Sequence, residues 1–114
     1  MKMKINYKKK NINLKVKKLN SLQMFLGLMF RTKETNILLF DFLYKGRWSI
    51  NSLFVFFPFL AIWLDEKDKV IEAEIVKPFS FSISPKKPIK KLIEVPINKK
   101  NKEILEFFGK RKGL

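Results

Sequence analysis

One arginine and two acidic residues are candidates for chemistry, because each lies beside or within an apolar segment. Arg31 follows the apolar stretch 22–30, and Asp41 and Glu94 each lie among strand-forming residues. A guanidinium group binds anions through paired hydrogen bonds, so Arg31 is a candidate contact for an anionic ligand. The preferred interpretation is structural, with Arg31 pairing with Asp41 or Glu94 to join a helix to a sheet. Catalysis is the third interpretation, and it requires these groups to converge in an open pocket.

The sequence contains no Cys and no His, which excludes thiolate nucleophiles, disulfides, the common zinc ligands and the usual proton shuttle at neutral pH. Asp65, Glu66 and Asp68 lie close together, but two lysines interrupt them and the Gly and distal Glu of a calcium-binding loop are missing. We therefore expect a solvated turn there, no metal and no cofactor. A non-enzymatic protein is the preferred interpretation.

The formal net charge of the 114-residue chain is +15, and only three of its 25 basic residues are Arg. The lysines cluster in 2–18, 86–102 and 110–112. If these clusters meet, they form a basic face that attracts nucleic acid or anionic lipid weakly and without sequence specificity. The candidate contacts on that face are Lys8, Lys9, Lys10, Lys86, Lys87, Lys90 and Lys91. Alternatively, the lysines reflect an AT-rich genome, or keep a Phe-rich protein soluble and protect its strand edges.

The elements that must position these residues are mainly strands. Apolar and polar residues alternate through 1–7 and again through 12–16, which predicts a hairpin with one buried face. Further strands are expected at 36–42, 71–75, 79–83 and 92–95, with a tight turn at 44–47. The Phe-rich run 53–64 is interpreted as core, with Pro58 marking a bulge or an edge.

Two short helices are also predicted. Asn20 or Ser21 is a suitable N-cap for a helix that ends near residue 28 or 29, with a stripe of core residues on one face. The stripe consists of Leu22, Phe25, Leu26 and Met29. Gly27 weakens a helix, which indicates close packing against a neighbouring strand. A second helix is expected over 104–108.

This pattern predicts a mainly β fold, namely a compact antiparallel sandwich or barrel with one or two short helices. We expect a single domain over 1–108 and a flexible basic tail over 109–114. The run 53–64 is too short for a membrane-spanning helix, and the stretch 22–30 has no small-residue cleavage site after it. A cytoplasmic location is therefore expected.

Four segments resemble the signature of an uncharacterised family, the domain of unknown function 192, also called uncharacterised protein family 0127. They are GLMFR at 27–31, FDF at 40–42, the block 50–70, and LIEVP at 92–96. Together they cover about 20–98, and they resemble archaeal forms in particular. The resemblance implies a jelly-roll-like β domain and supplies no reaction.

The resemblance also adds Asn51 and Ser52 as candidate ligand contacts. Many relatives carry a His or a Met-x-Asn-Thr near these two positions, and this chain departs from that pattern. The preferred function is therefore a binding or accessory module with an unknown ligand. The alternatives are weak polyanion binding by the lysine face and an enzyme that uses Arg31 with Asp41 or Glu94.

Overall fold

A computed structural model describes residues 1–109, so nearly all of the predicted flexible tail lies outside the described residues. Within residues 1–109 there are six strands and two short α-helices, so the expectation of a mainly β fold with short helices is confirmed. In chain order they are β1 (Lys2–Tyr7), β2 (Lys10–Lys18), α1 (Ser21–Leu26), β3 (Ile37–Gly46), β4 (Phe59–Leu64), β5 (Val70–Val76), β6 (Ile89–Pro96), the 3-10 turn η1 (Lys99–Asn101) and α2 (Lys102–Phe107).

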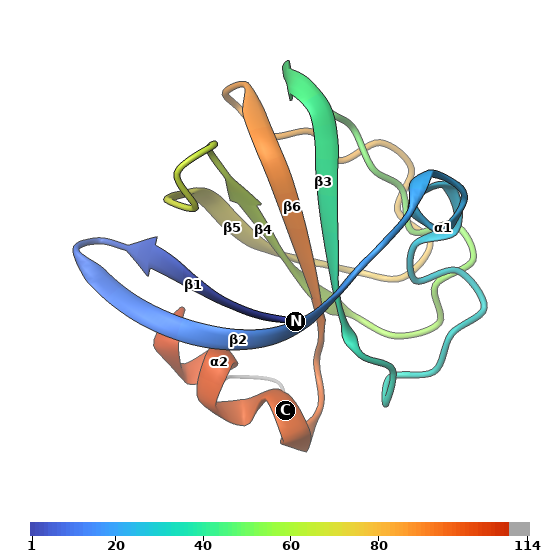
Figure 1. The fold of residues 1–114 in the computed structure, drawn as a ribbon. Helices are drawn as coiled ribbons and strands as arrows, with labels where there is room; N and C mark the ends of the chain where they lie inside the picture. Colours follow the sequence, from blue (N-terminus) through green and yellow to red (C-terminus); the bar gives the residue numbers. More distant parts are fainter. Residues whose placement is uncertain (110–114) are drawn as a thin grey trace.

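The strands form one curled sheet in the order β1-β2-β3-β6-β4-β5 (Figure 1). Its pairs are antiparallel, except that β2 and β3 run parallel over three residues each. The curl brings the two edges of the sheet close together. Asn6 N on β1 donates to Asp68 O, in the turn before β5, over 3.0 Å. The result is a half-barrel.

Both faces of the central strands are buried, so the sheet has a core on each side. The inner core includes Leu14, Leu39, Leu60, Ile62, Ile93, Leu105 and Phe108, and the β1-β2 hairpin and α2 cover it. The outer core includes Leu28, Leu38, Phe40, Ala61, Trp63 and Leu92, and α1 and the long loops cover it. Neighbouring residues of β3, β4 and β6 therefore contribute to opposite cores.

The elements predicted from local signals are present. The hairpin of β1 and β2 turns at Lys8 and Lys9, which both have positive φ. Asn20 caps α1, since its side chain accepts from Gln23 N over 2.8 Å while Gln23 Oε1 accepts from Asn20 N over 3.0 Å. This reciprocal pair satisfies two N–H groups at the start of the helix.

Four expectations are wrong in detail. Segment 79–83 forms only an isolated bridge, Ile50 to Ile83, because it pairs with an irregular loop rather than with a strand. The turn expected at 44–47 does not form there, since β3 continues to Gly46 with a register shift. The Phe-rich run is core only in part, because Phe54 and Phe56 are exposed, while Pro58 directly precedes β4 and so lies outside a strand interior as expected.

The fourth wrong expectation concerns the stripe of core residues predicted on the first helix. Leu22 and Leu26 are exposed, while Met24 and Leu28 pack against the outer core. The side chain of Phe25 is outside the described part of the structure. Helix α1 is only six residues long, and Gly27 ends it with a φ of 53°. The chain therefore leaves the helical path before the predicted stripe is complete.

No helix among residues 1–109 is both long enough and apolar enough to cross a membrane.

Candidate functional site

Glu94 lies in the middle of the sheet, on the side of the outer core. It pairs in register with Leu38 of β3 on one side and with Ala61 of β4 on the other. Both partners belong to the outer core, so the side chain of Glu94 points toward α1 and the loops. Only 4% of its surface is exposed.

The carboxyl group of Glu94 is incompletely hydrogen-bonded. Its Oε1 atom is buried and has no hydrogen-bond partner among the described residues. Burial disfavours the charged form and raises the pKa of this carboxyl from its usual 4.5 to about 8. At neutral pH the group is therefore mostly a neutral acid, with one hydrogen to donate and oxygens to accept.

A small hollow of about 140 Å³ lies against this carboxyl group. Its lining residues are Met24, Leu26, Gly27, Leu28, Met29, Phe40, Phe42, Ser49, Ile50, Asn51, Val55 and Glu94. A cavity of about 150 Å³ with apolar walls binds benzene in another protein, so this volume suits a six-membered ring or a group of that size. Most of the lining side chains are apolar, but polar atoms also contribute much of the lining surface, and Glu94 is the one titratable residue among the described residues that line the hollow.

Gly27 forms the part of the wall closest to the acid. A Cβ atom placed on Gly27 would lie 3.4 Å from Glu94 Oε1 and 3.2 Å from Phe40 Cζ. Its φ of 53° and ψ of −126° are also unfavourable for residues with a side chain. The close packing predicted for Gly27 is confirmed, and it brings the backbone of the GLMFR segment directly over Glu94.

Arg31 supports this wall and does not pair with either predicted acid. Its Nε donates to Gly27 O over 2.9 Å, and its Nη1 donates to Thr35 Oγ1 over 3.2 Å. Within residues 1–109, it forms no ion pair. The guanidinium group therefore holds the loop after α1 in place.

Asp41 is also separated from the hollow. Its carboxylate pairs with Lys90 Nζ over 2.6 Å and with Lys18 Nζ over 3.8 Å. The structure thus places Arg31, Asp41 and Glu94 in three different environments. Of these three predicted residues, only Glu94 lines the hollow.

Asn51 and Ser52 have different roles although they are neighbours. Asn51 lines the hollow and its Oδ1 accepts from Leu53 N over 3.2 Å. Ser52 is fully buried, and its Oγ donates to Lys77 O and accepts from Ser80 N, each over 2.7 Å. Ser52 therefore fastens two loops together, whereas Asn51 lies where a ligand can reach it.

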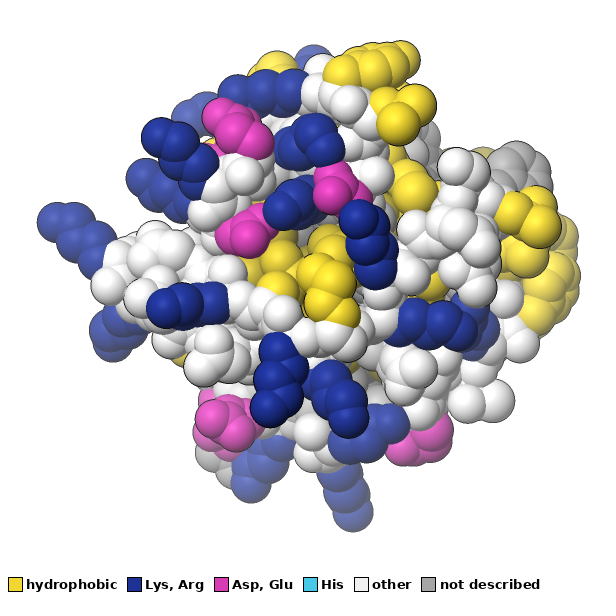
Figure 2. Space-filling view, in the orientation of Figure 1, with side chains coloured by type: hydrophobic (Ala, Val, Ile, Leu, Met, Phe, Trp, Pro, Cys, Tyr) yellow, Lys and Arg dark blue, Asp and Glu magenta, His cyan; other side chains and the backbone are white. Residues whose placement is uncertain are grey.

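The predicted lysine face is spread over several elements. Lys8, Lys9 and Lys10 lie at the hairpin turn, and Lys86 and Lys87 lie in the loop before β6. On β6, Lys90 pairs with Asp41 and Lys91 pairs with Asp68. Figure 2 shows lysines scattered over the visible face, with acidic side chains among those near its upper part. These lysines do not line the hollow at Glu94.

The acidic turn is built as an ordinary hairpin connection. Asp65 Oδ1 accepts from Lys67 N over 2.8 Å and from Lys69 N over 3.0 Å. The described residues contain no group of three or more acidic side chains that could hold a metal ion.

Several residues of the hollow were not singled out from the sequence. Phe42 and Val55 belong to segments that read as strand and core, and nothing local marks them as cavity walls. Met24 was also missed, although it comes three residues before Gly27 and the two positions lie on one side of a helix. The sequence feature that could have indicated the site is a single acidic residue within an otherwise apolar strand, as in LIEVP at 92–96.

The fold and the hollow define a class of small, mainly β domain with a half-barrel sheet and a pocket that contains a buried acid. The sequence model of the DUF192 family, described as "Uncharacterized ACR", matches residues 1–105. The chain therefore belongs to the DUF192 family, whose function is not established. The match begins before the span 20–98 and so includes the N-terminal hairpin.

Two solved structures share the fold at low sequence identity. One is from Sinorhizobium meliloti 1021 and is described provisionally as a transcription regulator, with 18% identity, a TM-score of 0.75, and coverage of 95% of this chain and 84% of the other. The second is a protein of unknown function from Novosphingobium aromaticivorans DSM 12444, with 14% identity, a TM-score of 0.74, and coverage of 93% and 76%. No curated protein sequence matches this chain.

Proposed function

We propose that this domain is a binding module that takes a small, mainly apolar group with one uncharged polar atom into the hollow at Glu94. The observation that carries this proposal is the buried Oε1 atom of Glu94, which has no hydrogen-bond partner among the described residues and lies at a hollow lined mostly by apolar side chains.

An unpaired buried oxygen is unusual, because more than about 90% of buried polar groups in proteins are hydrogen-bonded. Leaving one unpaired costs about 1–3 kcal/mol. A ligand group that hydrogen-bonds to Oε1 supplies a partner that the surrounding protein does not provide.

The protonation state of Glu94 favours a neutral ligand. With a pKa of about 8 in the ligand-free protein, the acid is mostly uncharged at neutral pH, so binding a cation would first require release of its proton. A charged ligand would also lose its hydration in a hollow lined mostly by apolar side chains, at a large free-energy cost. A hydroxyl, carbonyl or amide group fits this environment best.

Binding is favoured over catalysis because the titratable residues are dispersed. Arg31 is committed to Gly27 and Thr35, and Asp41 is committed to Lys90. General acid-base catalysis and nucleophilic catalysis both use groups within hydrogen-bond reach of each other.

The test uses phenol and toluene, which have nearly the same shape and differ in the hydroxyl group. Backbone amide shifts of ¹⁵N-labelled protein are followed during titration with each compound, for the wild type and for Glu94→Leu and Glu94→Gln. We expect shifts in Gly27, Asn51 and Val55, and a preference for phenol that falls about 3- to 10-fold in Glu94→Leu and is retained in Glu94→Gln.

The proposal fails if neither compound shifts the residues of the hollow. It also fails if the ratio of phenol to toluene affinity is the same in the wild type and in Glu94→Leu. The leucine variant should fold, because replacing an unpaired buried acid by an apolar group of similar size removes a desolvation cost.

We further propose that residues 1–108 act as one domain in the cytoplasm, and that the chain is of the archaeal type within its family. Weak polyanion binding by the lysine face stays a separate prediction. Retention on immobilised RNA across a salt series tests it, with a steep decrease in retention as the salt concentration rises as the supporting result.

A further inference from the structure

A second feature, on the other side of the sheet, is the free edge of strand β2. Val16 N donates to Met1 O over 2.8 Å, so the peptide groups of Val16 face β1. In an antiparallel pair this direction alternates along the strand. The N–H and C=O groups of Asn13 and Lys15 therefore point away from β1.

The opposite side of β2 has a strand partner over only part of its length. Leu19 N donates to Leu39 O over 3.0 Å, and β3 pairs with Val16, Lys17 and Lys18. The register Val16 to Ile37 places the C=O of Lys15 against Ile37 N, and among the described residues no strand pairs with this side of β2 over residues 10–14. The N–H and C=O groups of Asn13 and the N–H group of Lys15 thus form an open strand edge.

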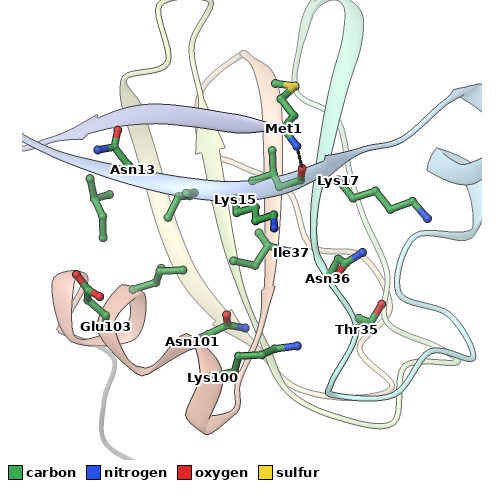
Figure 3. A pocket seen from close by; sticks show the side chains of 14 residues that line it. Met1, Asn13, Lys15, Lys17, Thr35, Asn36, Ile37, Lys100, Asn101 and Glu103 are labelled. Atoms are coloured by element: carbon green, nitrogen blue, oxygen red, sulfur yellow. Dashed lines mark hydrogen bonds between the residues drawn. The ribbon is translucent and has the colours of Figure 1, made fainter.

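This edge borders a groove of about 560 Å³. Figure 3 shows β2 on one side of it, α2 and η1 on the other, and Thr35 and Asn36 between β2 and η1 at one end. The volume falls within the range of about 300–1,000 Å³ that is typical of ligand sites. Asn13 and Lys15 are both lining residues, so the open peptide groups face a space rather than bulk solvent alone.

The groove has a mixed surface with a mainly basic rim. Met1, Ile12 and Ile104 are its partly exposed apolar side chains, whereas Leu14, Val16 and Ile37 are buried in the inner core. Three exposed lysines, Lys15, Lys17 and Lys100, lie around it, against one acidic lining residue, Glu103.

We propose that this groove binds an extended acidic peptide segment of another protein, which adds to β2 as a further strand. Strand addition supplies backbone hydrogen bonds from the peptide to the N–H and C=O of Asn13 and to the N–H of Lys15, and alternate side chains of the peptide point toward the partly exposed apolar side chains of the groove. The open edge over 11–15 accommodates about five peptide residues, at about 3.3 Å per residue.

The lysines around the groove indicate which kind of partner it binds. A second copy of this chain is disfavoured, because its own edge is also lysine-rich and like charges that face each other across strands repel. The net charge of +15 further opposes self-association. Acidic side chains are complementary to Lys15, Lys17 and Lys100.

The probe is an acetylated and amidated hexapeptide of alternating glutamate and valine, titrated into ¹⁵N-labelled protein. We expect saturable binding with amide shifts concentrated at Asn13, Lys15 and Asn36. Two N-methylated peptides form a matched pair, with the methyl groups either on alternate amides that face β2 or on the intervening amides. The first should bind about tenfold more weakly, because it loses the backbone bonds, and the second should bind like the parent.

Variants of the protein test the charge argument. Lys15→Glu should weaken binding about tenfold, whereas Lys87→Glu, with the same change in net charge outside the groove, should have less than about a threefold effect. Asn13→Pro removes the open N–H group and should also abolish binding, since proline cannot donate.

Equal affinities for the two N-methylated peptides would overturn the proposal, because they would indicate adsorption by charge alone. Equal binding of a lysine-valine peptide, absence of saturable binding, or shifts confined to other surfaces would overturn it as well. The peptide comparisons need only the wild-type protein, so they decide the question even if a variant does not fold. They are also independent of the hollow at Glu94.

Discussion

The buried acid at Glu94 predicts an unusual dependence of stability on pH. Its pKa is about 8 in the folded protein against a usual 4.5, which corresponds to about 5 kcal/mol. Below pH 4.5 both the folded and the unfolded chain carry the proton, so no stability is lost. As the pH rises toward 8, the unfolded chain releases the proton while the folded chain keeps it, so the free energy of unfolding decreases. Above pH 8 the loss is complete.

Urea denaturation at pH 5, 6, 7 and 8 measures this effect through the fluorescence of the buried Trp63. The chain has no His, so few other groups change charge in this range. In Glu94→Gln the side chain stays neutral at each pH. We expect this variant to be similar to the wild type near pH 5 and more stable by several kcal/mol at pH 8.

The matched control is Glu103→Gln, which makes the same chemical change at an exposed position of α2. It should leave the pH dependence of the wild type unchanged. If Glu94→Gln kept the same decrease in unfolding free energy between pH 5 and 8, Glu94 would not be the source of that decrease, because the acid would then ionise equally in the folded and the unfolded chain.

Three further substitutions test the architecture around the hollow by urea denaturation. Gly27→Ala should destabilise the fold by about 2–4 kcal/mol, through its positive φ and the contact with Phe40; a loss below about 0.5 kcal/mol would contradict this account. Ser52→Ala removes the hydrogen bonds of Oγ to Lys77 O and Ser80 N, and it should lower the free energy of unfolding by about 2–3 kcal/mol and speed amide exchange at Ser80. Unchanged exchange at Ser80 would contradict the role of Ser52 in joining the two loops. Asn20→Ala should cost about 1 kcal/mol, whereas Asn20→Asp should retain the cap.

The elements that sequence patterns predict well are those with a local cause. The hairpin of β1 and β2 follows from alternation of period two, and the start of α1 follows from the capping side chain of Asn20. Strands β5 and β6 likewise lie where alternating or apolar runs predict them. In each case, the residues that produce the signal also form the element.

Segment 79–83 shows where local alternation fails. Phe79, Phe81 and Ile83 alternate with serines, yet Phe79 has a φ of 60° and the segment gains one bridge only. Its backbone groups bond instead to Ser52 and Ile50 in an irregular loop. A strand needs a partner in register, and a sequence pattern does not show whether a partner is available.

The sequence by itself determined that Glu94 would lie on a strand, that Gly27 would pack closely, and that the fold would be mainly β. Only the tertiary structure decided which acid stays unpaired: Arg31 bonds within its own loop and Asp41 pairs with Lys90, so Glu94 is left beside a hollow lined mostly by apolar side chains. It also decided where β2 parts from β3 and leaves an open edge. Pairing and separation depend on residues far apart in the chain, whereas propensity and alternation act between neighbours.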